Sequence, residues 1–188
     1  MTFLTEMRDT VGSVLLAEGS EPEKATKDQA LAAIEKLDKA SKDGQIRRFT
    51  GNEYTKDLTK GDSWLIIGWS GDAVQLQADN PNIKFVAPET GVHLWTDNME
   101  IPIGAPAAFT AEKFIDFVYR PEIQAAITEY VNYVPPVKGA REILQERNPE
   151  VAENELIFPD LAKSHGFKSF PPEEEAEIEE AFQRAIGA

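Results

Sequence analysis

The chain has 188 residues, enough for one large domain or two small lobes, and its 41% hydrophobic and 28% charged residues are typical of a globular protein. It contains no cysteine, which excludes disulfide bridges, thiolate metal sites and cysteine nucleophiles. Its net charge of −14 disfavours binding to nucleic acid and to anionic membrane surfaces. No apolar stretch reaches the ~20 residues of a membrane span. Because the first residues lack a basic region and an apolar region, we expect no signal peptide in this chain.

The apolar pattern predicts two helices at the start of the chain. The first begins at the N-cap residue Thr5 and stops near Gly19, and the second covers about residues 27–41. A short strand is expected over residues 46–49, and a helical turn or a short helix over residues 53–60. The apolar residues that define the first helix are Leu4, Met7, Val11, Val14 and Leu15.

The middle of the chain contains the clearest strand signal. Residues 64–69 form a continuous apolar run, which indicates a strand buried on both faces of a sheet. A helix is expected over residues 73–78. Further short strands are expected over three ranges: 83–87, 91–96 and 99–103.

Helices predominate in the last third of the chain. They are expected over residues 111–119, 121–132, 139–147 and 173–186, whereas residues 148–169 are expected to be irregular. Strands interleaved with helices predict an α/β fold with a mainly parallel sheet flanked by helices. The last helix places one apolar face toward the core: Ile178, Ala181, Phe182 and Ala185.

Trp69 follows the predicted central strand directly. In open α/β sheets, ligands bind at the carboxyl ends of strands, so a tryptophan at this point is positioned to wall a cleft. The alternative is an ordinary core or surface aromatic. The sequence Gly-Trp-Ser-Gly from position 68 lacks the Gly-x-Ser-x-Gly spacing of a hydrolase nucleophile. Asp72, just after the turn, is expected to cap the next helix.

Trp95 and Asp97 are two residues apart, so on a strand their side chains point to the same face. A carboxylate beside an aromatic ring suits an alkylammonium group, because the carboxylate takes the charge-assisted hydrogen bonds and the ring covers methylene groups. The alternative is a core tryptophan followed by an aspartate that caps a turn. His93 is expected to be a structural residue.

Glu6 and Asp9 lie three residues apart and therefore share one face of the first helix. Acidic residues in an opening turn commonly do no more than stabilise the helix dipole. The sequence has no metal-ligand spacing, no glycine-rich phosphate loop and no specific catalytic pair. We therefore expect neither a cofactor nor enzymatic activity.

Three blocks of the chain, residues 64–72, 91–97 and 114–122, resemble the bacterial spermidine/putrescine-binding proteins of ABC importers in residues, order and spacing. The similarity extends to residues 133–136 and 158–159. The resemblance implies a periplasmic-binding-protein type II fold, in which two α/β lobes close over a polyamine. It also implies a periplasmic or extracytoplasmic location, with the polyamine and the transporter permease as partners.

The resemblance implies that six residues bind the ligand: Glu6, Asp9, Trp69, Trp95, Asp97 and Gln183. The two tryptophans match the family's ring-stacking positions, and the aspartate after the second one matches its amine-binding aspartate. The first two acids belong to the helix that opens the second lobe, with Glu in place of the family's Asp at the first position. The glutamine matches a polar residue of the last helix.

The same resemblance predicts an incomplete two-lobe architecture, because family members are longer and begin with a first-lobe segment that is not matched here. Residues 1–97 would form the second, ligand-binding lobe, residues 98–150 the return segment of the first lobe, and residues 151–188 a C-terminal part that packs back on the second lobe. The alternative function is a freestanding interaction or structural module that has lost transport. Such a module would self-associate through the exposed return segment.

Overall fold

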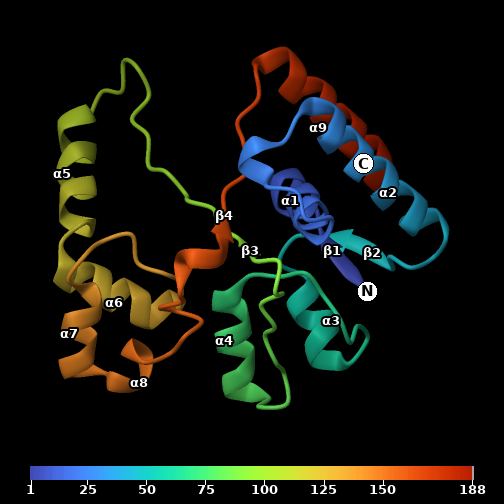
Figure 1. Cartoon of the computed structure of the whole chain (residues 1–188). Helices are drawn as coiled ribbons and strands as arrows, with labels where there is room; N and C mark the ends of the chain where they lie inside the picture. Colours follow the sequence, from blue (N-terminus) through green and yellow to red (C-terminus); the bar gives the residue numbers. More distant parts are fainter. Residues whose placement is uncertain (188) are drawn as a thin grey trace. The chain divides into compact units, whose positions relative to one another are not determined.

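A computed structural model describes residues 1–187, which divide into two compact units (Figure 1). Unit 1 comprises Met1–Gly68, Phe85–Trp95 and the segment from Ala162 onward. Unit 2 comprises Trp69–Lys84 and Thr96–Leu161. Each unit is therefore discontinuous in the sequence, and unit 1 joins the first residues to the last segment.

The helices of unit 1 are α1 (Met7–Ala17), α2 (Lys27–Lys42), α3 (Tyr54–Lys60) and α9 (Pro172–Ile186), with a 3₁₀ turn, η1, at Pro22–Lys24. Helix α2 begins with a capping box, in which the Thr26 side chain accepts from the Gln29 backbone N–H at 3.2 Å and Gln29 accepts from the Thr26 N–H at 2.9 Å. The N-cap of α1 is Glu6, so the predicted cap at Thr5 is wrong by one residue.

Unit 1 contains short parallel strands. Strand β1 (Thr2–Leu4) pairs with β2 (Arg48–Thr50), and β3 (Val92–His93) pairs with β4 (Ser164–His165). Every strand pair within residues 1–187 is parallel, which confirms the predicted direction. The pairs form two two-stranded sheets, however, so the single larger sheet that we expected is not present in the described chain.

The prediction of a doubly buried strand over residues 64–69 is wrong. Trp64 is 92% exposed and Leu65 60% exposed. This segment pairs with β1 through one isolated bridge, with Thr2 donating to the Leu65 carbonyl at 3.2 Å and accepting from Ile67 at 3.0 Å. Because the segment lies beside a strand of only three residues, its apolar side chains are not enclosed. Residues 83–87 and 99–103 are likewise irregular in the described structure.

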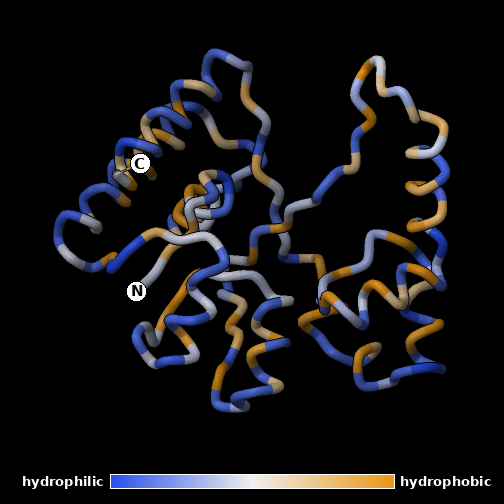
Figure 2. The backbone as a smooth tube through the Cα atoms, turned by 180° about the vertical axis from the view of Figure 1, so that it is seen from behind, coloured by the Kyte–Doolittle hydropathy of each residue, from blue (hydrophilic) through white to orange (hydrophobic). Residues whose placement is uncertain are grey.

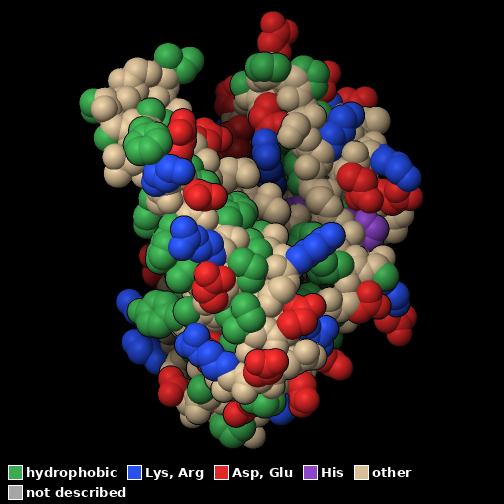
Figure 3. Space-filling view, turned by 90° about the vertical axis from the view of Figure 1, so that its left-hand side faces the viewer, with side chains coloured by type: hydrophobic (Ala, Val, Ile, Leu, Met, Phe, Trp, Pro, Cys, Tyr) green, Lys and Arg blue, Asp and Glu red, His purple; other side chains and the backbone are tan. Residues whose placement is uncertain are grey.

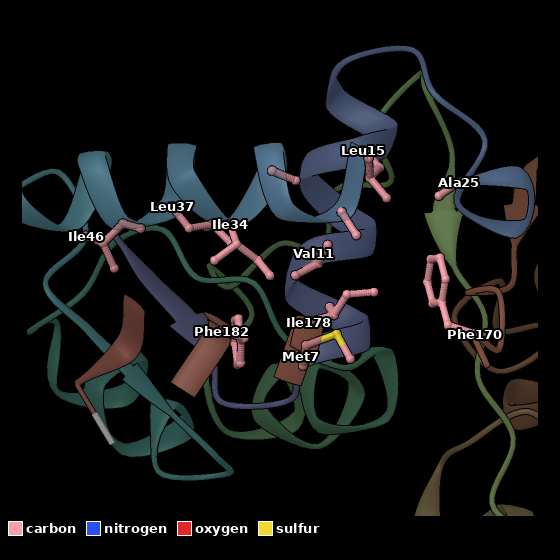
Figure 4. Packing of buried hydrophobic residues seen from close by; sticks show 12 residues of the cluster. Met7, Val11, Leu15, Ala25, Ile34, Leu37, Ile46, Phe170, Ile178 and Phe182 are labelled. Carbon is pink, nitrogen blue, oxygen red and sulfur yellow. The ribbon is translucent and has the colours of Figure 1, made fainter. Parts of the chain in front are cut away.

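The core of unit 1 lies where α1, α2 and α9 meet (Figure 4). Helices α2 and α9 run side by side in Figures 1 and 2. The predicted apolar face of α9 is confirmed, since Ile178 and Phe182 are fully buried. Two ion pairs fasten α9 to its neighbours, Arg8–Glu175 and Lys27–Glu177, both at 2.8 Å.

The helices of unit 2 are α4 (Ser70–Asp79), α5 (Ala108–Val118), α6 (Pro121–Val131), α7 (Ala140–Arg147) and the short α8 (Pro149–Ala152). A small core joins α6, α7 and α8 through Ala125, Ala140, Leu144 and Ala152. The segment 148–169, expected to be irregular, contains α8, a 3₁₀ turn (η2, Leu161–Lys163) and β4.

Helix α5 leaves its apolar face uncovered, since none of its described residues is buried. Phe109 is 69% exposed and Phe114 is 60% exposed. Figure 3 shows hydrophobic side chains, interrupted by charged ones, on the side of the molecule that carries α5, α6 and α7. Within residues 1–187, no helix combines the length and the apolar character that crossing a bilayer requires.

Candidate functional site

The first helix of unit 1 begins with two of the predicted site residues. Glu6 is the N-cap of α1, and Asp9 lies in the first turn with a side chain that is only 17% exposed. Burial, and after it the neighbouring charge of Glu6, raise the pKa of Asp9 from 3.8 to about 6, against a backbone hydrogen bond that lowers it. Burial therefore opposes the charge of Asp9, whereas an exposed helix-capping acid keeps a low pKa.

His93 faces Asp9 from β3, with 3.9 Å between its Nε2 and Oδ1 of the aspartate. The imidazole lies against Gly12, where a Cβ atom would be 3.1 Å from Nδ1, and its ring meets the edge of Phe167 at a centroid distance of 6.3 Å. Burial lowers the pKa of His93. Sequence reasoning treated this residue as structural only, because its contact with α1 spans more than eighty positions.

Trp95 follows β3, and it is 39% exposed. The strand ladder continues past β3, because Leu94 donates to the carbonyl of His165 at 2.9 Å. Unit 1 therefore places a partly exposed indole two residues after the histidine that faces Asp9.

Gln183 lies on α9, where its Nε2 donates to Oε1 of Glu179 at 2.6 Å. This bond joins positions i and i+4 of one helix and orients the amide along the helix surface. The amide is half-buried beside the core residue Phe182.

In unit 2, the N-terminus of α4 packs directly on Tyr133. The Tyr133 hydroxyl donates to Oδ1 of Asp72 at 3.1 Å, and a Cβ atom on Gly71 would lie 2.7 Å from Cζ of the ring. The N-cap position of α4 belongs to Trp69, so the expected capping role of Asp72 is wrong: Asp72 lies inside the first turn and accepts from Tyr133.

Asp97 is exposed and lies in the irregular chain after Trp95. Burial, followed by the charge of Asp72 and its hydrogen bond, raises the pKa of the Tyr133 hydroxyl, and Asp97 contributes in the same direction. In unit 2, the carboxylates of Asp72 and Asp97 thus both act on Tyr133, next to helix α4, whose N-cap is Trp69. Tyr133 was not among the predicted site residues, although it opens the segment 133–136 that carries part of the family resemblance.

Each unit therefore combines carboxylates with aromatic rings. Unit 1 contributes Glu6, Asp9 and Trp95, and unit 2 contributes Trp69, Asp72, Asp97 and Tyr133. This combination suits organic cations, because carboxylates accept hydrogen bonds from ammonium groups while aromatic faces attract the cation and cover its carbon chain. The described part of the chain contains no group of three or more side chains arranged to hold a metal ion.

Comparison with known proteins identifies a family and several relatives. The family described as "Bacterial extracellular solute-binding protein" matches residues 2–159. The chain is 32% identical over 120 residues to the putrescine-binding periplasmic protein PotF of Escherichia coli K12. This match covers 61% of the present chain and 32% of PotF. It is also 32% identical over 130 residues to the spermidine/putrescine-binding periplasmic protein of Salmonella typhimurium, covering 69% of this chain and 36% of that protein.

A solved structure from Listeria monocytogenes, assigned as a spermidine/putrescine ABC transporter, resembles the chain with a TM-score of 0.85 and 26% sequence identity. This likeness covers 98% of the present chain and 56% of the Listeria chain. The chain thus spans about a third of the length of the sequence relatives it matches, and about half the length of the matching structure.

Proposed function

Because the chain belongs to the family of bacterial extracellular solute-binding proteins, we propose that it binds a polyamine, spermidine or putrescine, for import by an ABC transporter. The family is one of binding proteins, which release their ligand unchanged, so the prediction that the chain is not an enzyme is confirmed. The polyamine is the finer part of the proposal. It is supported by the names of the relatives and by the chemistry of the site residues.

The observation that carries the proposal is the pairing of acids with aromatic rings in both units. A polyamine is a chain of ammonium groups separated by methylenes, so it needs carboxylates at intervals and apolar faces between them. In this proposal the ammonium groups bind Glu6, Asp9 and Asp97. Two further sets of contacts complete it, ring stacking on Trp69 and Trp95 and a polar contact from Gln183.

The organisation of the whole protein is part of the same proposal. Residues 1–97 would be the second lobe of the binding protein, residues 98–150 the return segment of the first, and residues 151–188 the part that packs back on the second. The permease of an ABC transporter would be the protein partner, and the location would be periplasmic or extracytoplasmic.

Binding can be tested by titrating the chain with spermidine, putrescine and 1,4-butanediol at low ionic strength, using NMR chemical shifts or calorimetry. The diol has the carbon chain of putrescine without its charges. We expect saturable binding of both polyamines and none of the diol. Equal responses to all three compounds, or no response to any, would overturn the proposal.

A second function is favoured by helix α5. Its apolar face is uncovered in the described structure, and the hollow beside it is lined by Glu112, Ile115, Asp116 and Tyr119. Exposed apolar patches commonly mark interaction sites. If the chain binds no polyamine, we propose that it acts as an interaction module that self-associates through α5.

A further inference from the structure

His93 is an unusual residue for a protein core. Its side chain is only 8% exposed, and its Nδ1 has no hydrogen-bond partner among residues 1–187. Buried polar atoms without a partner are rare, and each calls for an explanation. A leucine or isoleucine would fill the space between Gly12 and Phe167 without burying a polar nitrogen. Packing alone therefore gives no reason for an imidazole at this position.

The other ring nitrogen, Nε2, lies 3.9 Å from Oδ1 of Asp9, a distance too long for a direct hydrogen bond but close enough for the imidazole dipole to act on the carboxylate. The remaining charged or titratable groups around the pair are Glu6 on α1, Glu23 on η1 and His165 on β4. His165 is the ladder partner of His93 in the β3–β4 pair and contacts Glu23 at 3.1 Å. The Asp9–His93 pair thus has an acid on each side and a second imidazole beside it.

These neighbours determine which protonation state the imidazole takes. A proton on Nδ1 would have no acceptor among residues 1–187, since this buried atom lies against Gly12 without a hydrogen-bond partner, so the neutral form with its hydrogen on Nε2 fits the site best. Burial lowers the pKa of His93, and His165 adds to this effect while Glu23 opposes it. Near neutral pH, His93 therefore presents a dipole to Asp9 and no positive charge.

We infer that His93 is a positioning residue of the polyamine site, whose neutral imidazole orients the Asp9 carboxylate and leaves its negative charge for an ammonium group of the ligand. This inference rests on the proposed function. A lysine or arginine at position 93 would neutralise the charge of Asp9 and compete with the ligand's ammonium group for it. The arrangement also gives binding a lower pH limit: the pKa of Asp9 is about 6, so the carboxylate is lost as the pH falls through that value.

The test compares the wild-type chain with His93→Leu and His93→Gln. Leucine fills the space of the imidazole but has no dipole. The glutamine amide retains an N–H that reaches toward Asp9, and it cannot become charged. The first measurement needs no ligand: the Asp9 carboxyl is titrated by ¹³C NMR and assigned by its loss in Asp9→Asn. We expect the midpoint to rise in His93→Leu and to stay near that of the wild type in His93→Gln. A midpoint that is the same in all three proteins overturns the inference.

The second measurement is the dissociation constant for putrescine at low ionic strength, at about pH 7 and about pH 5. We expect His93→Leu to weaken binding near pH 7 about two- to fivefold, within what one partly exposed ion pair contributes, and His93→Gln to bind within about 1.5-fold of the wild type. Equal affinity in His93→Leu and the wild type overturns the inference. Absence of putrescine binding by the wild type at both pH values overturns the proposed function, and with it the role of His93 toward a ligand.

The amide NMR spectrum shows whether a His93 variant is folded. If neither variant folds, the titration of the His93 ring is compared between the wild type and Asp9→Asn. In Asp9→Asn the negative charge that favours imidazolium is gone, so the His93 ring should titrate at a lower pH than in the wild type. An unchanged His93 titration in that variant counts against the contact.

Discussion

At the residue scale, Asp9, a proposed ligand-binding acid, shows how a buried carboxylate lowers the stability of the fold. Its pKa rises from 3.8 to about 6 on folding, so the folded state holds the proton more tightly than the unfolded chain does. The contribution of Asp9 to stability is therefore fully present below pH 3.8 and is lost as the pH rises through about 6. The loss is on the order of 2–3 kcal/mol for a carboxyl that is largely buried.

We therefore predict that Asp9→Asn is more stable than the wild type at neutral pH, by up to about 2–3 kcal/mol. The difference should shrink as the pH falls toward 4, and urea unfolding at both pH values measures it. The control is Asp28→Asn, which changes an exposed acid in the first turn of α2 and should shift stability by less than about 0.5 kcal/mol. If Asp9→Asn is destabilising at neutral pH, the carboxylate is held by contacts stronger than its burial cost.

Asp97 and Asp72 provide a second comparison of single residues. Asp97 is exposed, so its contact with an ammonium group should contribute ~0.2–1 kcal/mol, less than the ~1.5–3 kcal/mol expected for a desolvated pair. We predict that Asp97→Asn weakens putrescine binding about two- to fivefold. Asp72→Asn should weaken it less, because Asp72 already accepts from Tyr133. Equal effects of the two substitutions on the measured dissociation constants would show that the ligand contacts are assigned wrongly.

At the element scale, the start of α4 depends on the absence of a side chain at Gly71. A Cβ atom there would lie 2.7 Å from Cζ of Tyr133, so we predict that Gly71→Ala destabilises unit 2 by about 1–3 kcal/mol through overpacking. Gly166→Ala is the control, since an added Cβ meets nothing within 4 Å at that position. In a Tyr133→Ala background the penalty should disappear, which a double-mutant cycle by urea unfolding would detect.

The helices of this protein are largely predictable from its sequence, whereas the strands are predictable only in part: β2 and β3 overlap the expected ranges 46–49 and 91–96, and the other strands were missed. Helices α2 and α9 follow directly from apolar spacing, and a capping box at Thr26 marks where α2 begins. Strand β1 was missed because it has only three residues, and its Leu4 fits the apolar stripe of the helix that follows. An apolar run such as residues 83–87 carries no information about whether a ladder partner exists.

The candidate site likewise has residues that the sequence indicates and residues that it does not. Acids and tryptophans are visible in the sequence because their residue types and short spacings suit an organic cation. His93 and Tyr133 are not, because their roles depend on glycines that are distant in the sequence. Gly12 makes room for the imidazole and Gly71 for the phenol ring, and only the folded chain shows which side chain fills each space.

At the scale of the whole molecule, exposure limits affinity. The proposed ligand contacts are partly or fully exposed, so each ion pair contributes ~0.2–1 kcal/mol. Three acids and two tryptophans would then give about 3–5 kcal/mol, a dissociation constant on the order of 0.1–10 mM for this chain alone. Binding should weaken as salt rises, since the screening length falls from ~30 Å at 0.01 M to ~3 Å at 1 M. A sub-micromolar constant at high salt would contradict this prediction.

The uncovered face of α5 leads to a different expectation about the whole chain. We predict that light scattering shows a mass that rises with concentration and that an apolar dye binds the protein. Phe114→Glu places a charge on the exposed apolar face and should reduce both signals. Thr110→Glu adds the same charge at an exposed polar position of the same helix and should change them little. A strict monomer that binds no dye would exclude the interaction module.

Unit 1 draws its core from both ends of the chain, and this has a consequence during synthesis on the ribosome. The early contributors end at Ile46, while Phe170, Ile178 and Phe182 come from the last segment. At about 5–20 residues per second, the roughly 120 residues between them take on the order of 6–25 s to make. For that time the nascent chain presents the apolar faces of α1 and α2 without α9 to cover them. Chaperones that hold unfolded chains, or machinery that exports them, would have this interval in which to act.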